Sequence, residues 1–104
     1  MRHLPDFADR LIRLTNERWE HIVERAEMDG LQGTIAETLL TPREMVQSAT
    51  DESAWLYYRS CPRTIVGARF LCVVVKHDGD DAFVLTAYLT DRIKKGLRIW
   101  PTRN

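Results

Sequence analysis

The sequence predicts an α+β fold in which two N-terminal helices pack on an antiparallel sheet of three to five strands. Apolar residues recur at helical spacing up to Leu40, and short runs rich in β-branched and aromatic residues follow from Met45 onward. Helices followed by a run of strands indicate a sheet with helices on one face. The chain has 104 residues, the size of one ordinary domain, so we assign residues 1–104 to a single domain.

Two helices are expected in the first part of the chain, after a short edge strand within residues 7–14. Thr15 is a suitable N-cap for a helix over residues 16–28, because its hydroxyl can accept a hydrogen bond from a free backbone amide. The apolar stripe of that helix has i, i+3, i+4 and i+7 spacing and consists of Trp19, Ile22, Val23 and Ala26. A second helix is expected over about residues 34–40, and the following Thr-Pro pair ends it, since the residue before a proline disfavours the α region.

The second part of the chain is expected to form strands. The runs with strand composition are residues 55–60, 69–76 and 82–88, followed by a short last run, residues 97–100. Between the second and third runs, residues 77–81 read His-Asp-Gly-Asp-Asp, a hairpin turn signal. These strands are therefore expected to pair in antiparallel fashion.

Charge is unevenly spread along a chain whose formal net charge is zero. Residues 1–58 hold six Arg and eleven Asp or Glu, a net of −5, and residues 59–104 hold nine Lys or Arg and four Asp, a net of +5. Such asymmetry indicates either a surface that binds polyanions or two halves whose charges complement each other where they pack. The sequence leaves both interpretations open.

Several classes of protein are disfavoured by the composition. The longest apolar run, residues 70–75, is too short to span a bilayer, and the N-terminus lacks the apolar core of a signal peptide, so a cytoplasmic protein without membrane contact is expected. Cys61 and Cys72 lie in no CxxC or His/Cys cluster, which argues against a disulfide scaffold and a structural zinc site. No metal or other cofactor is expected.

The first helix separates its charges on two flanks. On a helical wheel its four glutamates fall on one side of the apolar stripe, and Arg18, His21 and Arg25 fall together on the other. One interpretation is a solvated amphipathic helix. The other is a basic flank that faces a phosphate-binding groove, with His21 as the general acid or base.

The predicted strands place hydroxyls and cations near one another. Along residues 82–90 the pleat is expected to send Thr86 and Tyr88 to one face together with Val84, and Leu85 to the other. Tyr58, Arg59 and Lys76 lie in the neighbouring predicted strands, from which they could complete a polar patch. Alternatively, these are ordinary strand residues and strand-end cations.

The order of several segments resembles a known group of nucleases. The segments are HIVER in the first helix, then TLLTPREMV, LYYR, LCVVVK, FVLTAYLTDRIKKG and a closing Trp, together covering about residues 15–100. They resemble the small phage- and plasmid-associated proteins of the barnase/EndoU/colicin/RelE-like group. The resemblance implies a concave sheet face that holds RNA and a metal-independent ribonuclease, in many members a toxin paired with an antitoxin. Such enzymes move the 2′-hydroxyl onto the adjacent phosphate, which needs an acid, a base and cations.

The resemblance also implies roles for individual residues. The candidate catalytic residues are His21 as general acid or base, Arg25, Arg59 and Lys76 for phosphate charge, Thr86 as a donor to a phosphate oxygen, and Tyr88, which orients the scissile group or stacks on a base. The candidate substrate-binding residues are Arg18, Tyr58, Arg92, Lys94 and Lys95. If the six catalytic candidates do not line one cleft, the hypothesis of an enzyme fails.

One position departs from the pattern of the group. The helix motif there continues with a second His directly after the Arg, where this chain has Ala26 within the predicted apolar stripe. Three functions therefore stay open: a ribonuclease, a non-catalytic domain of the same fold that binds RNA or a protein, and an antitoxin or structural accessory protein. The expected partners are RNA and an antitoxin. The chain is expected to be a monomer, or a dimer through an edge strand.

Overall fold

The computed structural model describes residues 1–101 of the chain. Within them lie seven strands, two α-helices and one short 3-10 helix, η1. The strands are β1 Arg2–Pro5, β2 Leu11–Leu14, β3 Glu44–Ser48, β4 Ala54–Cys61, β5 Arg69–Asp78, β6 Asp81–Thr90 and β7 Gly96–Trp100. The helices are α1 Asn16–Val23, η1 Ala26–Met28 and α2 Gln32–Leu40, all between β2 and β3.

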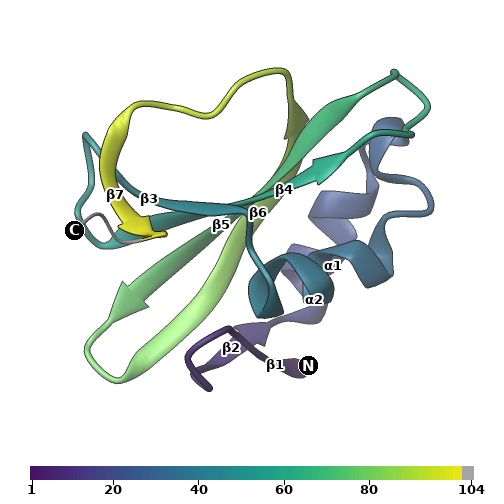
Figure 1. Cartoon of the computed structure of the whole chain (residues 1–104). Helices are drawn as coiled ribbons and strands as arrows, with labels where there is room; N and C mark the ends of the chain where they lie inside the picture. Colours follow the sequence, from purple (N-terminus) through teal and green to yellow (C-terminus); the bar gives the residue numbers. More distant parts are fainter. Residues whose placement is uncertain (102–104) are drawn as a thin grey trace.

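The strands form one sheet in the order β1-β2-β6-β5-β4-β3-β7 (Figure 1). Neighbouring strands are antiparallel, except that β2 and β6 are parallel and meet at Arg13 and Phe83. The predicted antiparallel sheet of three to five strands is therefore wrong, because residues 1–101 build a mixed sheet of seven strands. The molecule consists mostly of sheet, with two short α-helices on it.

Two strands that the sequence did not predict, β1 and β3, account for the extra strands. The sequence of β1, RHLP, ends in proline and has no apolar alternation, yet all four of its residues pair with β2. The sequence of β3, EMVQS, is only five residues long and pairs with both β4 and β7. In both strands, partners from elsewhere in the chain stabilise a conformation that the local sequence favours only weakly.

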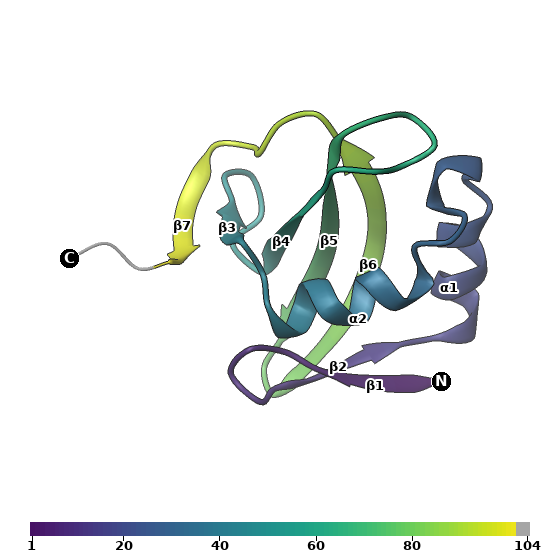
Figure 2. The same ribbon diagram turned by 45° about the vertical axis from the view of Figure 1, so that its right-hand side comes forward.

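Both α-helices lie on the same face of the sheet. Figure 2 shows α2 across the strands and α1 beside β6. The core beneath them joins Ile22, Ile35 and Leu39 of the helices to sheet residues that include Ile12, Tyr57, Leu71, Val73 and Val84. Neither the helices nor any other helical segment of residues 1–101 has the length and apolar character needed to cross a membrane.

The opposite face of the sheet, here called the helix-free face, has a second apolar cluster. Its buried members are Val46, Ala54, Leu56, Tyr58, Cys72 and Val74. Residues 91–95, here called the arch, cross from the end of β6 to β7 and close over part of this face (Figure 1). Ile93 of the arch packs against the cluster, as do the half-buried side chains of Leu85 and Tyr88.

A β-bulge in β6 changes which residues face the helices. Val74 of β5 pairs with Thr86 and the next residue, Val75, pairs with Val84, so Leu85 is left without a partner. Because a bulge adds one residue to one strand, the alternation of side chains shifts at that point. Val84 therefore joins the helix-side core and Leu85 the helix-free face, which is the reverse of the predicted arrangement.

Helix α1 ends earlier than the sequence pattern indicates. Arg25 has an extended backbone, with φ −76° and ψ 121°, and separates α1 from η1. Its guanidinium Nη1 donates a hydrogen bond of 2.9 Å to the backbone carbonyl of Ala87 in β6. Ala26, predicted to lie in the apolar stripe, is instead exposed at the start of η1.

The β1–β2 hairpin is fixed to the sheet by a buried carboxylate. Asp6 is fully buried and accepts hydrogen bonds from the Arg10 side chain and the Tyr57 hydroxyl, both at 2.8 Å, and from the backbone amides of Ala8 and Arg10, both at 3.0 Å. Burial on its own would raise the pKa of Asp6, but these hydrogen bonds outweigh it and lower the pKa below its ordinary value.

Candidate functional site

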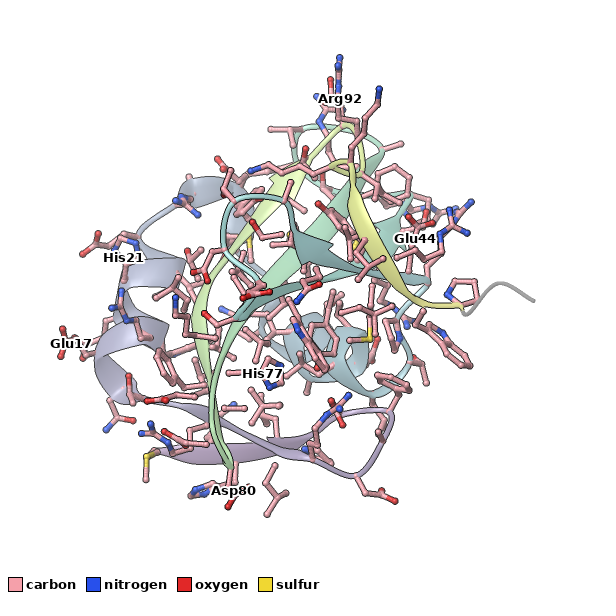
Figure 3. All side chains as sticks on the ribbon, turned by 90° about the vertical axis from the view of Figure 1, so that its left-hand side faces the viewer. Glu17, His21, Glu44, His77, Asp80 and Arg92 are labelled. Atoms are coloured by element: carbon pink, nitrogen blue, oxygen red, sulfur yellow. The ribbon has the colours of Figure 1, made fainter. Side chains whose placement is uncertain are left out.

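Positive charge gathers at one end of the sheet, where β4 and β6 end and β5 begins. The pairing of Phe70 with both Ser60 and Thr90 brings these three strand ends together. The cations at this basic end are Arg59, Arg63, Arg69, Arg92, Lys94 and Lys95. Figure 3 shows Arg92 at this end and Asp80, in the acidic turn between β5 and β6, at the other.

Part of the charge asymmetry along the sequence is cancelled by ion pairs between the two halves of the chain. Three acids of the first half pair with cations of the second half, namely Glu37 with Arg59, Glu44 with Arg98, and Asp51 with Lys76. Among residues 1–101, however, Arg63, Arg69, Lys94 and Lys95 form no ion pair. These four cations leave the basic end with positive charge that can attract a polyanion.

Arg25 meets Tyr88 where α1 lies against β6, a place here called the α1–β6 junction. The guanidinium carbon of Arg25 lies 6.0 Å from the centre of the Tyr88 ring, at the outer limit of a cation–π contact. The same guanidinium holds the Ala87 carbonyl with one of its five N–H donors. The remaining donors can bind an anion such as a phosphate.

The Tyr88 phenol is protonated at neutral pH. Burial, followed by the proximity of Cys72, raises the pKa of Tyr88 well above its ordinary value, against a smaller opposing effect of Arg25. Tyr88 can therefore donate a proton or a hydrogen bond but cannot act as a base. Burial likewise raises the pKa of the Cys72 thiol to about 11, so this cysteine is not an activated nucleophile.

Thr86 lies two residues before Tyr88 on the helix-free face. Its Oγ1 atom is buried and has no hydrogen-bond partner among residues 1–101. The hydroxyl does not present itself to solvent, so it can contact a substrate only if the surrounding side chains rearrange. Its predicted role as a donor to phosphate stays a prediction.

His21 lies in the last turn of α1, four residues before Arg25. Its side chain is exposed, and within the described residues it makes no hydrogen bond or ion pair (Figure 3). Arg18, one turn earlier, is half-buried. The basic flank of α1 thus continues toward the α1–β6 junction, with an imidazole that solvent can reach.

Arg59 and Lys76 lie elsewhere in the structure. Arg59 donates a hydrogen bond of 2.9 Å to the Thr41 hydroxyl and pairs with Glu37 of α2 at 3.5 Å, on the helix side of the sheet. Lys76 pairs with Asp51 near the acidic turn. The six catalytic candidates therefore do not line one cleft, and the ribonuclease hypothesis fails in its six-residue form.

Tyr58 fixes the arch to the sheet. Its side chain is fully buried, and its hydroxyl accepts a hydrogen bond of 3.1 Å from the backbone amide of Lys94. A buried Tyr58 cannot touch a substrate directly, so its predicted role in substrate binding becomes one of holding the arch. Arg92, Lys94 and Lys95 of the arch are all exposed.

A cavity of about 760 Å³ lies beneath the arch, between it, β3 and β7. Two of the predicted substrate-binding residues, Lys94 and Lys95, line it. The other lining residues are Glu44, Val46, Ile93, Gly96, Leu97 and Arg98. Sequence reasoning missed these residues, because only the path of β7 back along β3 brings them together.

Arg63 and Arg69 of the basic end were also missed. Both flank the loop between β4 and β5, in which Ile65 and Val66 are exposed. The sequence signal that could have found them is a run from residue 59 to residue 69 with three arginines and no acid. Counting charge in short windows, instead of in halves of the chain, would have located this end.

Within residues 1–101 no three His, Cys, Asp or Glu side chains lie close enough together to hold a metal ion. The α1–β6 junction and the basic end thus consist of arginines, lysines, a histidine and a tyrosine. Comparison of the chain with protein-family models, with curated proteins and with solved structures finds no match. The chemistry of these residues is accordingly the basis on which a function can be inferred.

Proposed function

We propose that this protein is a metal-independent endoribonuclease whose reacting phosphate lies at the α1–β6 junction. The single observation that supports this proposal is the contact between Arg25 and Tyr88. The exposed His21 lies four residues before Arg25. An arginine for phosphate charge, a protonated phenol and an imidazole are the groups that transfer of a 2′-hydroxyl onto a phosphate needs. The proposed site has three of the six catalytic residues expected from the sequence, namely His21, Arg25 and Tyr88.

The proposed reaction assigns one step to each side chain. Neutral His21 takes the proton of the 2′-hydroxyl as that oxygen attacks the adjacent phosphorus. The bond from phosphorus to the 5′ oxygen breaks, and the leaving oxygen takes a proton from the Tyr88 phenol, which water then restores. Arg25 stabilises the negative charge that builds on the phosphate oxygens. The products are a 2′,3′-cyclic phosphate and a 5′-hydroxyl end.

The basic end extends the site for RNA beyond the reacting phosphate. Arg92, Lys94 and Lys95 follow directly after β6, the strand that holds Tyr88. Cations that track a single-stranded backbone supply most of the affinity of such proteins for RNA. The proposal includes a cytoplasmic location, a monomeric or dimeric chain, and an antitoxin protein as partner.

A second candidate function is RNA binding without cleavage. It is favoured by His21 itself, since no hydrogen bond from residues 1–101 orients its imidazole, and by Ala26, which stands where the resembling nucleases have a second histidine. Enzymes hold a catalytic base in place through such contacts. The two candidates share the RNA-binding surface and differ only in the chemistry.

The test is an RNA-cleavage assay with the purified chain, single-stranded RNA and EDTA. We expect cleavage that EDTA does not inhibit and products that end in a 2′,3′-cyclic phosphate. His21→Ala should lower the rate about 100-fold, the usual effect of losing a general base. Tyr88→Phe, which removes only the hydroxyl, should lower it at least about tenfold.

The matched control is His3→Ala, which removes another exposed histidine, in β1. It should leave the rate unchanged. Cleavage that persists in the His21→Ala chain would remove His21 from its proposed role. RNA binding with no cleavage by the unaltered chain would favour the second candidate, and neither binding nor cleavage would reject both.

A further inference from the structure

We propose that the cavity beneath the arch binds one nucleotide, with its base against the apolar wall and its phosphate at Lys94 and Lys95. This inference rests on the proposed function, because the nucleotide is taken to belong to the RNA strand that enters the α1–β6 junction. It goes further by naming a second binding site, at the β3–β7 end of the sheet. A free mononucleotide has the same chemistry, so the experiment below separates the two sources.

The cavity has the size and the fixed frame of a ligand site. Its volume of about 760 Å³ lies within the range of roughly 300–1,000 Å³ that small-molecule sites occupy. At one side, the Tyr58 hydroxyl holds the backbone of Lys94. At the other side, Gly96 packs so closely on β3 that a Cβ atom there would lie 2.6 Å from Val46 Cγ1 and closer still to the Gln47 carbonyl oxygen. These two contacts fix the arch to the sheet on both sides of the cavity.

The charge of the cavity suits an anion. Of the charged residues that line it, Glu44 and Arg98 pair with each other, with Oε1 and Nη2 3.3 Å apart. Lys94 and Lys95 are exposed and form no ion pair among residues 1–101. Two ammonium groups that form no ion pair are free to bind a phosphate.

The remaining wall of the cavity suits a flat apolar group. Val46, Ile93 and Leu97 form it, and the Leu97 side chain is 68% exposed. Covering an exposed leucine with a nucleobase removes apolar surface from water on both partners. The Glu44–Arg98 pair beside this wall offers both acceptors and donors to the polar edge of a base.

The position of the cavity fits a strand that passes through both sites. Ile93, which lines the cavity, and Tyr88, at the junction, are five residues apart and pack against the same apolar cluster on the helix-free face. A nucleotide in the cavity therefore lies only a few nucleotides along the RNA from the reacting phosphate. The cavity would fix which phosphate of the strand reaches Arg25 and Tyr88.

The experiment is an NMR titration of the 15N-labelled His21→Ala chain, which should cleave about 100-fold more slowly. It is titrated with a ten-nucleotide single-stranded RNA and separately with 5′-UMP and 5′-AMP. We expect the RNA to shift the backbone amide signals of residues 93–98. Lys94→Gln/Lys95→Gln should weaken RNA binding at least about tenfold at low salt, because two phosphate contacts are lost. The matched comparison, Arg63→Gln/Arg69→Gln, removes the same charge at the same end but outside the cavity and should weaken binding by a clearly smaller factor.

The outcomes separate this inference from the proposed function. If RNA shifts residues 93–98 and the mononucleotides do not, the cavity is a subsite for the RNA strand. If a mononucleotide alone gives the same shifts, the cavity is a nucleotide site in its own right. Equal losses for the two double variants, or shifts confined to other residues, overturn the inference even when the unaltered chain cleaves RNA. Shifts at residues 93–98 in a chain that proves unable to cleave RNA keep the inference and reject the nuclease.

Discussion

Asp6 is the residue whose loss should most affect stability. Its buried carboxylate accepts four hydrogen bonds that join the β1–β2 hairpin to β4 through Tyr57. Asp6→Ala would leave those donors buried without an acceptor, so we expect the free energy of unfolding to fall by about 3 kcal/mol. Urea denaturation followed by circular dichroism measures this change. Asp80→Ala, at an exposed acid in the turn between β5 and β6, is the control and should change stability by less than about 0.5 kcal/mol.

The same carboxylate makes stability depend on pH at the acidic end of the scale. Because the folded pKa of Asp6 is lower than its ordinary value of 3.8, its contribution is fully present above pH 4 and is lost as the pH falls through the folded pKa. Asp6→Asn, which has no charge to titrate, should therefore show a smaller loss of stability between pH 4 and pH 2 than the unaltered chain. Equal losses in the two chains would show that other acids control acid unfolding.

Ala26 offers a gain-of-function test of the proposed reaction. The residue is exposed and directly follows Arg25, so a histidine at this position would reach solvent beside the α1–β6 junction. Ala26→His should raise the rate of RNA cleavage at pH 7 at least about tenfold, because a second acid or base is supplied. Ala26→Gln is the control, since it adds a polar side chain that does not titrate. A rate for Ala26→His no higher than that of Ala26→Gln would contradict the proposed site.

The face on which a strand residue lies could be predicted from sequence only in part. Tyr58 and Arg59 were grouped together, but neighbouring residues of a strand point to opposite faces, and Arg59 reaches α2 while Tyr58 lies on the helix-free face. Arg25 and Tyr88 were expected only as two of the six candidates that the resemblance implies, and their contact is a finding of the structure. The backbone of Arg25 could not be predicted, because its bond to the Ala87 carbonyl joins residues 62 positions apart.

At the scale of elements, two glycines make a matched pair of tests. Gly96 touches the backbone of β3 where β7 begins, whereas Gly33 in α2 has open space where a Cβ would lie. Gly96→Ala should lower the free energy of unfolding by about 1–3 kcal/mol, since β7 must move away from Gln47. Gly33→Ala should raise it by about 0.5 kcal/mol, because alanine loses less backbone entropy in a helix.

Hydrogen exchange locates the effect of the Gly96→Ala change. The amide of Lys94, held by the Tyr58 hydroxyl, and the amides that pair β7 with β3 should exchange faster, while those of β5 should not. Faster exchange throughout the sheet would mean that β7 does not open on its own. Destabilisation by Gly33→Ala would show that α2 has less room at this position than the structure indicates.

The elements that sequence predicted well are those with a strong local pattern. The hairpin of β5 and β6 follows from apolar runs with strand composition on both sides of an Asp-Gly turn, and Thr15 caps α1 as expected. The bulge at Leu85 has no such signal, because it depends on how β6 fits against β5 and under the helices. The first strand, β1, was missed for a similar reason, since its only strong determinants are its pairing with β2 and the anchor at Asp6.

At the scale of the molecule, the separation of charge predicts a strong effect of salt on RNA binding. If four phosphates contact the basic end and the α1–β6 junction, log K should fall with log salt with a slope of about −2.8, roughly a 50-fold loss between 50 and 200 mM salt. Fluorescence anisotropy of a labelled RNA bound to the His21→Ala chain measures this slope. A slope near zero would show that RNA is not held through its phosphates, and both candidate functions would then lose their support.

The net charge of each half of the chain could be predicted from the sequence, but the positions of the charged side chains in the fold could not. Both interpretations of the asymmetry hold in part, since four ion pairs join the halves while Arg63, Arg69, Lys94 and Lys95 of the basic end form no ion pair among residues 1–101. The acids and cations of the second half separate because β5 and β6 are long strands with Asp78 and Asp81 at one end and Arg69 and Arg92 at or beyond the other. The length of β5 and β6 therefore separates these acids and cations to opposite ends of the sheet.

The parallel contact between β2 and β6 also sets the order in which the fold can form. Arg13 donates to Asp81 at 2.9 Å and 2.6 Å, and this pair joins residues 68 positions apart. Contacts of such separation form late, because the intervening chain must first lose its freedom. Docking of the β1–β2 hairpin should thus follow assembly of β4, β5 and β6, so that Arg13→Gln would speed unfolding while leaving the folding rate nearly unchanged. During synthesis on the ribosome, β1 and β2 are therefore made first but can join the sheet only after β6 has been made.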